Sequence, residues 1–306
     1  MSSVRELLEP AVARLRASGS ETARLDAELL LGHVLGIDRT GLIAHPDAPV
    51  GDGQAAAFET DLERRERGEP VAYIRGFKEF AGIALAVDRR VLIPRPETER
   101  LVELVETEVV DRLIRAPREA GSGPLRLADI GTGSGAVAIA LAVSLRRRRM
   151  LEEVEILATD VSEDGLDVAR LNAVGHGVAD RVRFATGDLL EAVSGGPIDV
   201  LAANLPYVPT AAVDELPIAA SFEPRPALDG GPDGLAVVRR LLDGLTAVLT
   251  PGGVAFLEIG SDQADDVMLA ADERLPGWGG RIELDLSGRP RVARIERASI
   301  AEVARG

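Results

Sequence analysis

Cysteine is missing from this 306-residue chain, which excludes disulfides, thiolate zinc sites and a cysteine nucleophile. Histidine is scarce, and its three positions lie far apart without the spacing of metal ligands, so no metal site is expected: His33, His45 and His176. No apolar run is long enough to span a bilayer, and the first residues lack the apolar core of a signal peptide. We therefore expect a cytoplasmic protein that has no membrane partner.

Positive charge is also in short supply. Lysine and arginine number 35 against 50 aspartates and glutamates, which leaves a formal net charge of −15. This balance argues against a broad basic face, so no stable nucleic-acid partner is expected. The composition is otherwise that of a globular protein, 46% hydrophobic and 28% charged, and the length predicts two domains or one large one.

Three regions follow one another along the chain. In residues 1–72 apolar residues recur at helical spacing, which predicts a small helical domain. In residues 73–94 short apolar runs are broken by glycines and charged residues, which predicts a hairpin that connects two domains. The third region, residues 95–306, is expected to open with a helix from Glu97 towards Arg115.

Strand-like and helical segments alternate from Leu125 onward. The predicted strands are Leu125–Ile130, Val154–Thr159, Val182–Thr186, Ile198–Ala203, Gly253–Ile259, Ile282–Leu286 and Val292–Glu296. The predicted helices between them are Ala136–Leu145, Glu163–Ala173 and Leu235–Leu249. This order predicts an α/β fold, a Rossmann-like, mostly parallel sheet with helices on both faces, closed by an antiparallel hairpin of the last two strands.

A glycine-rich loop follows the first predicted strand and leads into a helix: Asp129-Ile130-Gly131-Thr132-Gly133-Ser134-Gly135. Its glycines let the backbone turn tightly and approach a ligand, and the helix N-terminus offers free N–H groups. The loop lacks the Gly-Lys-Ser/Thr of a phosphate-binding loop. Its spacing fits a nicotinamide dinucleotide as well as S-adenosylmethionine, so an oxidoreductase remains an alternative at this point.

Three acidic residues near the ends of successive strands favour S-adenosylmethionine. Asp160 ends the second strand, where a carboxylate can accept the two hydroxyls of a ribose, and Asp188 follows the third, where it can reach an adenine amino group. Asp129 stands just before the glycines, where it suits the ammonium of a methionyl group and would repel a pyrophosphate. Each alone is more often a helix cap, but the three together weaken that interpretation.

The fourth strand ends in a tetrapeptide, Asn204-Leu205-Pro206-Tyr207. The Asn204 side-chain oxygen and the carbonyl of Leu205 can accept both hydrogens of a planar NH2 group and orient its lone pair for methylation. Pro206 stiffens the segment, and Tyr207 can pack on the planar group and exclude water. The alternative is an ordinary turn, which the preceding cofactor loop makes less favoured.

With these motifs the chain resembles the N5-glutamine methyltransferases that modify peptide chain release factors. The resemblance covers most of the chain and is carried, besides the glycine loop and the tetrapeptide, by Tyr73-Ile74-Arg75-Gly76 with Phe80, Leu92-Ile93-Pro94-Arg95-Pro96-Glu97-Thr98-Glu99, Phe222-Glu223-Pro224-Arg225-Pro226-Ala227-Leu228, Gly230-Gly231-Pro232-Asp233-Gly234, and Glu258-Ile259-Gly260 with Gln263.

The resemblance implies a class I S-adenosylmethionine-dependent methyltransferase domain behind a helical domain that helps to dock the release factor. The methyl acceptor would be the side-chain amide of the glutamine in the Gly-Gly-Gln loop of class I release factors, and the cofactor would leave as S-adenosylhomocysteine. The cofactor would be lined by Gly131, Thr132, Gly133, Ser134, Gly135, Asp160, Leu189 and Asn204. The glutamine would be held by Asn204, Leu205, Pro206 and Tyr207.

One position departs from the family pattern. The family usually has Asn-Pro-Pro-Tyr, whereas Leu205 stands second here, so some backbone rigidity is lost while the carbonyl acceptor stays. Asn-Leu-Pro-Tyr is the form of rRNA adenine dimethyltransferases, so adenine methylation of RNA or DNA is the rival function. The Pro94–Glu99 segment and the charge of −15 argue against it, and an intact tetrapeptide argues against a non-catalytic binding module.

Overall fold

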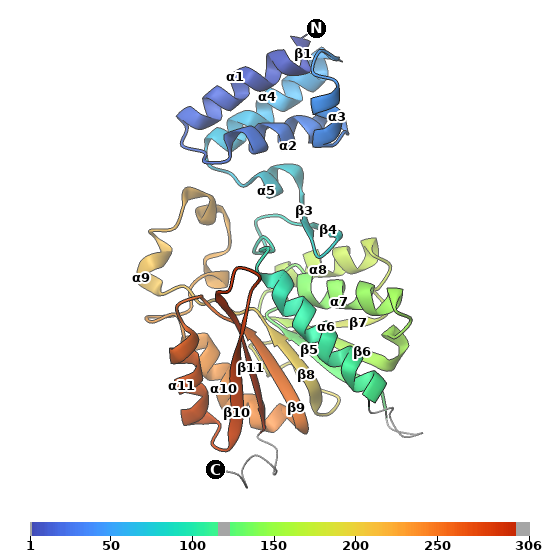
Figure 1. Ribbon diagram of the computed structural model, residues 1–306, viewed down its shortest axis with the longest axis vertical. Helices are drawn as coiled ribbons and strands as arrows, with labels where there is room; N and C mark the ends of the chain where they lie inside the picture. Colours follow the sequence, from blue (N-terminus) through green and yellow to red (C-terminus); the bar gives the residue numbers. More distant parts are fainter. Residues whose placement is uncertain (1, 116–122, 298–306) are drawn as a thin grey trace. The chain divides into compact units, whose positions relative to one another are not determined.

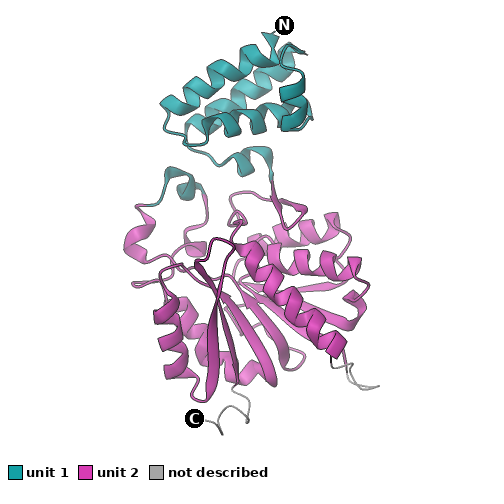
Figure 2. Cartoon of the chain, in the orientation of Figure 1, with its two compact units in different colours: residues 1–77, 216–222 teal, residues 78–215, 223–306 magenta. Residues whose placement is uncertain are grey.

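The computed structural model describes residues 2–115 and 123–297, and the chain divides into two compact units (Figure 2). Unit 1 comprises Met1–Phe77 and Leu216–Phe222, and unit 2 comprises Lys78–Glu215 and Glu223–Gly306. Each unit has its own core, and each is described by itself.

Unit 1 is a helical bundle in which α1, α2 and α4 lie side by side (Figure 1). Its helix α1 begins with a capping box, in which the Glu6 N–H donates to Ser3 Oγ and the Ser3 N–H donates to the Glu6 carboxylate. Its core is built from apolar residues that recur at helical spacing, among them Leu15, Leu30, Leu31, Phe58 and Leu62. The elements are β1 (Ser2–Ser3), α1 (Val4–Ala17), α2 (Ala23–Leu35), α3 (Arg39–Ala44), β2 (Pro49–Val50), α4 (Asp52–Glu66), α5 (Val71–Arg75) and a 3₁₀ turn at Ile218–Phe222.

A hairpin lies within the range predicted for it, residues 73–94, but is shorter, because the residues up to Arg75 belong to helix α5. Strands β3 (Phe77–Phe80) and β4 (Ile83–Ala86) form a two-stranded sheet and are joined by Ala81 and Gly82. Both joining residues have positive φ, 47° and 73°, as a tight two-residue hairpin turn requires. The Glu99 carboxylate accepts a hydrogen bond from the Ala81 N–H at 3.0 Å, which ties this turn to the first turn of α6.

Unit 2 contains the predicted α/β sheet, seven strands in the order β10-β11-β9-β8-β5-β6-β7 (Figure 1). Five of these strands are parallel, and β10 and β11 form the expected antiparallel pair at one edge. The strands are β5 (Leu125–Ile130), β6 (Val154–Asp160), β7 (Val182–Thr186), β8 (Ile198–Ala203), β9 (Leu249–Glu258), β10 (Trp278–Leu284) and β11 (Pro290–Arg297).

Helices cover both faces of this sheet because alternate strand residues point to opposite sides. Leu127 belongs to the core beneath α6 and α7, whereas its neighbour Ala128 belongs to the core beneath α10 and α11. The helices of unit 2 are α6 (Thr98–Arg115), α7 (Ala136–Arg147), α8 (Glu163–Gly175), α9 (Thr210–Val213), α10 (Ala236–Val248) and α11 (Ala264–Arg274), with 3₁₀ turns at Leu151–Glu153 and Arg225–Ala227.

The next-to-last strand begins earlier than expected. The apolar pattern predicts it over Ile282–Leu286, but β10 starts at Trp278 and ends at Leu284. The glycines that follow Trp278 hide the strand pattern, yet their backbones pair with β11, and Trp278 itself lies opposite Arg297. The Arg297 guanidinium lies 5.4 Å from the centre of the Trp278 indole ring, a cation–π contact between β11 and β10.

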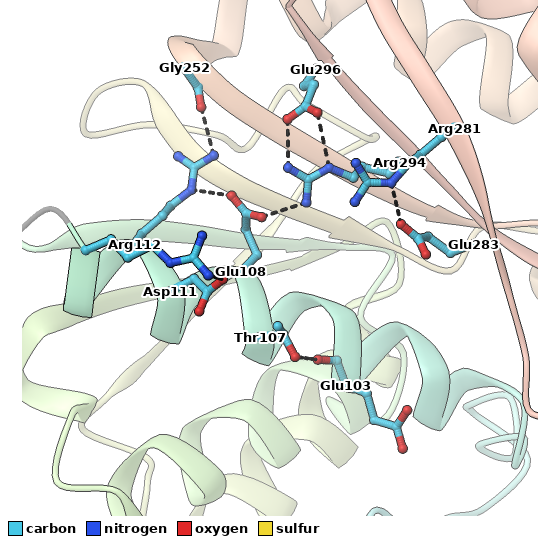
Figure 3. Close-up of polar contacts among 11 residues, drawn as sticks. Glu103, Thr107, Glu108, Asp111, Arg112, Gly252, Arg281, Glu283, Arg294 and Glu296 are labelled. Atoms are coloured by element: carbon cyan, nitrogen blue, oxygen red, sulfur yellow. Dashed lines mark hydrogen bonds and ion pairs between the residues drawn. The ribbon is translucent and has the colours of Figure 1, made fainter.

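A network of charged side chains ties α6 to the antiparallel edge of the sheet (Figure 3). The Glu108 carboxylate accepts from Arg112 Nε and from Arg294 Nη1, each at 2.6 Å, and Arg294 also donates to Glu296. Burial alone would raise the pKa of Glu108, but the two guanidinium hydrogen bonds outweigh it and lower that pKa. This cluster therefore keeps a half-buried carboxylate ionised and fastens α6 to β11.

Candidate active site

The sheet brings two of the predicted motifs together at one place. The chain runs outward from β5 through β6 and β7 on one side and through β8 and β9 on the other, so strand order reverses between β5 and β8. Ile130 and Ala203 are paired at the carboxyl ends of these strands, and the glycine loop and the tetrapeptide follow them directly. Open α/β sheets bind ligands at such a reversal.

The glycine loop leaves open backbone where a cofactor would lie. Gly131, Gly133 and Gly135 all have positive φ, 72°, 54° and 80°. A Cβ on Gly131 would lie 3.0 Å from Leu205 Cδ2, and one on Gly135 would lie 2.6 Å from the Ile139 side chain, so these two glycines permit close packing. A Cβ on Gly133 would meet nothing within 4 Å, so this glycine faces open space.

Asp129 lies beneath the loop, 1% exposed. Its Oδ2 accepts from the Thr132 hydroxyl at 2.6 Å and from the Ala138 N–H in the first turn of α7 at 3.1 Å. Burial raises the pKa of Asp129 to about 6, against the lowering effect of these two hydrogen bonds. A cation bound beside this carboxylate would favour its ionised form.

Asp160 is the last residue of β6 and is joined to the same loop. Its Oδ2 accepts from the Gly133 N–H at 2.8 Å and its Oδ1 from the Ser162 N–H at 2.9 Å. Each carboxylate oxygen has a further lone pair, so the side chain can hold the loop and still accept from a ligand.

Asp188 is only indirectly connected to this group. Its carboxylate forms an ion pair with Arg240 of α10, and the backbone joins the others where the Gly187 N–H donates to the Asp160 carbonyl at 3.0 Å. Leu189, which follows, has φ of 51°, a left-handed conformation that is rare for leucine and typical of functional loops.

The other residues of the glycine loop fix its shape through backbone hydrogen bonds more than through their side chains. The N–H groups of Gly131 and Thr132 both donate to the Thr159 carbonyl at 2.9 Å. Ser134 is 2% exposed, and its carbonyl accepts from Asn172 Nδ2 at 2.9 Å. These bonds hold the loop in one shape behind its open glycine.

The tetrapeptide presents two acceptors that no donor among the described residues uses. Asn204 Nδ2 donates to Thr98 Oγ1 at 3.1 Å, so the amide nitrogen points toward α6. Within residues 2–115 and 123–297, neither Asn204 Oδ1 nor the Leu205 carbonyl accepts a hydrogen bond. These are the oxygens that the sequence predicts as acceptors for a planar NH2 group.

Leu205 occupies the position where the family usually has proline. Its side chain is 5% exposed, packs in the core beneath α10 and α11, and reaches Gly131 of the glycine loop. The leucine therefore links the two motifs through its side chain, while its backbone carbonyl stays in place as an acceptor.

Three further residues lie against the backbone carbonyls of Pro206 and Tyr207. The sequence pattern alone assigns no role to any of the three. Gln263 Nε2 donates to the Tyr207 carbonyl at 3.0 Å. A Cβ on Gly234 would lie 2.3 Å from that same carbonyl, and one on Gly230 would lie 2.7 Å from the Pro206 carbonyl, so only glycine fits at either position. The tyrosine ring is half-buried, and burial raises the pKa of its phenol.

Two hallmark runs of the sequence meet at Glu223. This buried carboxylate accepts from the Ile93 N–H at 3.0 Å and from Arg95 Nη2 at 2.5 Å. It thereby holds the Pro94-Arg95-Pro96 segment, which leads into Thr98 at the start of α6. The sequence around Glu223 does not predict this contact, because Ile93 lies 130 residues away in the chain.

The described residues include no helix with the length and apolarity to cross a membrane. They also contain no group of three or more histidines, aspartates or glutamates that could hold a metal ion.

Comparison with known proteins agrees with this architecture. Residues 6–76 match a family model described as the PrmC N-terminal domain. The release factor glutamine methyltransferase of Moorella thermoacetica is 42% identical over 286 residues, covering 91% of this chain and 95% of the relative. That of Deinococcus radiodurans is 38% identical over 296 residues, covering 96% and 99%.

A solved structure supports the fold alone. The catalytic domain of human Mettl16, crystallised with a hairpin from the MAT2A 3′ untranslated region, aligns with a TM-score of 0.52 at 16% identity and covers 85% of each chain. Because this chain matches the two relatives over nearly their whole length, it belongs to the release factor glutamine methyltransferase family.

Proposed function

We propose that this chain transfers a methyl group from S-adenosylmethionine to the side-chain nitrogen of the glutamine in the Gly-Gly-Gln loop of class I peptide chain release factors. The observation that carries the proposal is the pair of unused acceptors, Asn204 Oδ1 and the Leu205 carbonyl, beside an open glycine loop. A release factor substrate would place the reaction in the cytoplasm, beside the translation machinery.

The residues around the loop fit the cofactor. Gly133 leaves space for it, Asp129 offers a buried carboxylate to its ammonium, and Asp160 has lone pairs left for ribose hydroxyls. We assign the adenine amino group to Asp188, with Leu189 beside the ring, which requires the Arg240 side chain to share or release that carboxylate. When bound, S-adenosylmethionine would supply an electrophilic methyl group on its sulfonium and leave as S-adenosylhomocysteine.

The tetrapeptide supplies the acceptor chemistry. A carboxamide nitrogen is a poor nucleophile because its lone pair is delocalised into the carbonyl. Hydrogen bonds from its two N–H groups to Asn204 and Leu205 would fix its plane and direct the lone pair toward the methyl carbon. As the nitrogen–carbon bond forms and the carbon–sulfur bond breaks, positive charge develops on the nitrogen, and both oxygens stabilise it. One nitrogen proton then leaves to water.

We further propose that the helical domain, residues 1–72, docks the release factor, that residues 73–94 connect it, and that residues 95–306 carry out the reaction. The match of residues 6–76 to a domain characteristic of the family supports this division of roles. Adenine methylation, the rival function, requires a nucleic-acid partner, which the net charge of −15 disfavours.

The deciding experiment offers the full chain three acceptors together with labelled S-adenosylmethionine: a class I release factor, rRNA and DNA. We expect label in the release factor alone, one added methyl on the glutamine of its Gly-Gly-Gln loop by peptide mass spectrometry, and none when that glutamine is replaced by alanine. Cofactor binding is checked separately by calorimetry. Binding of the cofactor without methylation of the release factor, or label in rRNA instead, would refute the proposal.

A further inference from the structure

Glu258 is a buried carboxylate that the mechanism above does not use. It is the last residue of β9 and is 1% exposed. Neither of its oxygens has a hydrogen-bond partner of good geometry among the described residues. Buried carboxylates are ordinarily paired or multiply hydrogen-bonded, because removing a charge from water is costly. An unpaired one beside a reacting group therefore needs a functional explanation.

Its position is next to Asn204. Strands β8 and β9 are parallel neighbours with Ala203 opposite Leu257, so Asn204 and Glu258 follow at adjacent strand ends. Thr98, the buried first residue of α6, lies beside both: its oxygen accepts from Asn204 Nδ2 at 3.1 Å, and its hydroxyl lowers the pKa of Glu258 without making a hydrogen bond of good geometry to that carboxylate. The three side chains form a chain that ends at the predicted acceptor oxygen.

Charged groups face Glu258 from several elements. Arg291 of β11 and Arg95 before α6 lower its pKa, and Glu97 raises it. The phenol of Tyr207, after β8, faces the same carboxylate, and its own pKa is raised in part by Glu258. Burial is the largest influence, and the net result raises the pKa of Glu258 to about 7.

We propose that Glu258 is a positioning residue, which acts through Thr98 to determine which end of the Asn204 amide faces the substrate. The proposal rests on the methyl transfer proposed above. An ionised carboxylate can only accept, so it attracts the single hydroxyl proton of Thr98, which turns toward Glu258 although no hydrogen bond of good geometry joins the two in the structure. The Thr98 oxygen then accepts from Asn204 Nδ2, and Asn204 Oδ1 is left to accept from the substrate carboxamide.

Protonation of Glu258 removes the constraint that sets this order, since the carboxyl can then donate as well as accept. A protonated carboxyl, or a glutamine amide in its place, can donate to the Thr98 oxygen, and the Thr98 proton then turns toward Asn204. The Asn204 amide satisfies that donor by rotating, which brings its NH2 group to the substrate side. Two NH2 groups facing each other cannot hydrogen-bond, so the carboxamide loses one of its two anchors.

The kinetic test compares the full chain with Glu258→Gln and Thr98→Val, using a release factor as substrate between about pH 5.5 and 9. In the unsubstituted chain we expect kcat to fall as the pH drops through about 7, the pKa of Glu258. Both variants lose about 10–100-fold in kcat at pH 8, with little change in cofactor affinity, and both lose the inflection near neutral pH. The double variant is no worse than either single one, because the two residues act in one chain.

Two matched controls complete the kinetic test. Thr98→Ser keeps the hydroxyl and retains kcat within about threefold together with the pH profile. Glu108→Gln, which changes a half-buried glutamate within α6 itself, leaves the profile unchanged. A Glu258→Gln variant with the original kcat and pH profile overturns the proposal, as does full additivity with Thr98→Val.

A second readout needs neither substrate nor activity. The chain contains two asparagines, Asn172 and Asn204, so selective ¹⁵N-asparagine labelling yields two side-chain amide signals. We expect the Asn204 signal to titrate near pH 7 in the unsubstituted chain and in Thr98→Ser, and to stay constant in Glu258→Gln and Thr98→Val. Asn172, bonded to Ala86 and Ser134 backbone groups, serves as the internal reference.

An Asn204 signal that does not titrate in the unsubstituted chain refutes the positioning role, even if release factors are methylated. A titrating signal without release factor methylation upholds the positioning role and refutes the substrate instead. The two proposals therefore fail separately.

Discussion

Unit 2 holds two glutamates that differ in how their charge is satisfied. Glu108 is half-buried within helix α6, and Glu258 is buried at the end of β9, beside the first residue of α6. Glu108 accepts hydrogen bonds from two guanidinium groups, and its pKa is lowered (Figure 3). Glu258 has no partner of good geometry among the described residues, and its pKa is raised to about 7. The charge of Glu108 is therefore paired with two arginines, whereas that of Glu258 has no such pairing among the described residues and lies beside Asn204.

This difference indicates what each region does for the protein. A carboxylate paired with two arginines stabilises the fold around pH 7 and becomes costly only when a partner is removed. An unpaired buried carboxylate costs stability whenever it is ionised. Such a cost is common where a side chain is held for chemistry, as perturbed pKa values at functional sites show. Substitutions in the two regions should therefore separate activity from stability.

The largest expected effect is on activity, at the reacting region. Asn204→Ala removes one of the two acceptors for the substrate carboxamide, so methyl transfer should fall about 100–1,000-fold. Unfolding by urea should change little, because the side chain of Asn204 is partly exposed and makes one hydrogen bond to the residues that the structure describes. Activity per folded molecule, together with fluorescence of the sole tryptophan, Trp278 of β10, measures both quantities. Retained activity would contradict the assignment of the tetrapeptide.

A substitution in the cluster of Glu108, Arg112, Arg294 and Glu296 should lower stability and leave activity nearly unchanged. Arg294→Met keeps most of the aliphatic stem but leaves Glu108 with one guanidinium partner, so the unfolding free energy should fall by about 2–4 kcal/mol. Specific activity below the unfolding transition should remain within about threefold of the original. Adding Glu108→Gln should restore part of the stability, since no under-paired charge then remains. Wild-type stability in Arg294→Met would show that the cluster is not structural.

A smaller effect concerns the pH dependence of stability. The pKa of Glu258 is raised in the folded state, so the folded chain binds its proton more tightly than the unfolded chain does. Its contribution to stability is full below about pH 4.5 and is lost as the pH rises to about 7. Glu258→Gln should therefore be more stable than the unsubstituted chain at pH 8, by about 1–2 kcal/mol, while losing activity.

Glu108 provides the control of opposite sign. Its folded-state pKa is lowered, so its contribution is present above the ordinary value of 4.5 and is lost as the pH falls below it. Glu108→Gln should therefore destabilise the chain at pH 8. If both variants shift stability in the same direction at that pH, the contrast between the two glutamates is wrong.

The smallest effect is expected at Leu205. Leu205→Pro restores the usual family residue and removes no backbone hydrogen bond among the described residues, because none is formed by the Leu205 N–H. Stability should change by less than about 1 kcal/mol, since lost packing against Gly131 offsets the lower entropy of the unfolded chain. Activity should stay within about threefold, because the carbonyl at this position is unchanged. A large loss would show that the leucine side chain itself has become part of the site.

Much of the fold follows from local sequence patterns. Strands β5, β7 and β8 have the bounds that their apolar runs predict, because turn residues stand at their ends. The start of β10 could not be predicted, because the glycines after Trp278 have no side chains to show alternation. Their strand conformation comes from pairing with β11, which is a tertiary interaction.

The site divides in the same way. The predicted acceptor group, Asn204 to Tyr207, is a local motif, and so is the glycine loop. The contacts of Thr98 with Asn204 and of Glu223 with Ile93 could not be predicted, because each joins residues more than a hundred positions apart. The place of Glu258 beside Asn204 could not be predicted either, because it depends on the pairing of β8 with β9.

The amino-acid order alone determined strands β5, β7 and β8, the glycine loop, the acceptor tetrapeptide and the family resemblance, because each depends on residues close together in the chain. Only the folded sheet decided that Leu205 lies against Gly131, that Thr98 contacts Asn204, and that Glu258 ends its strand without a hydrogen-bond partner in the described part of the chain. The physical reason is that parallel strands place their carboxyl ends side by side whatever their separation in sequence, and burial there changes the charge state of a carboxyl group.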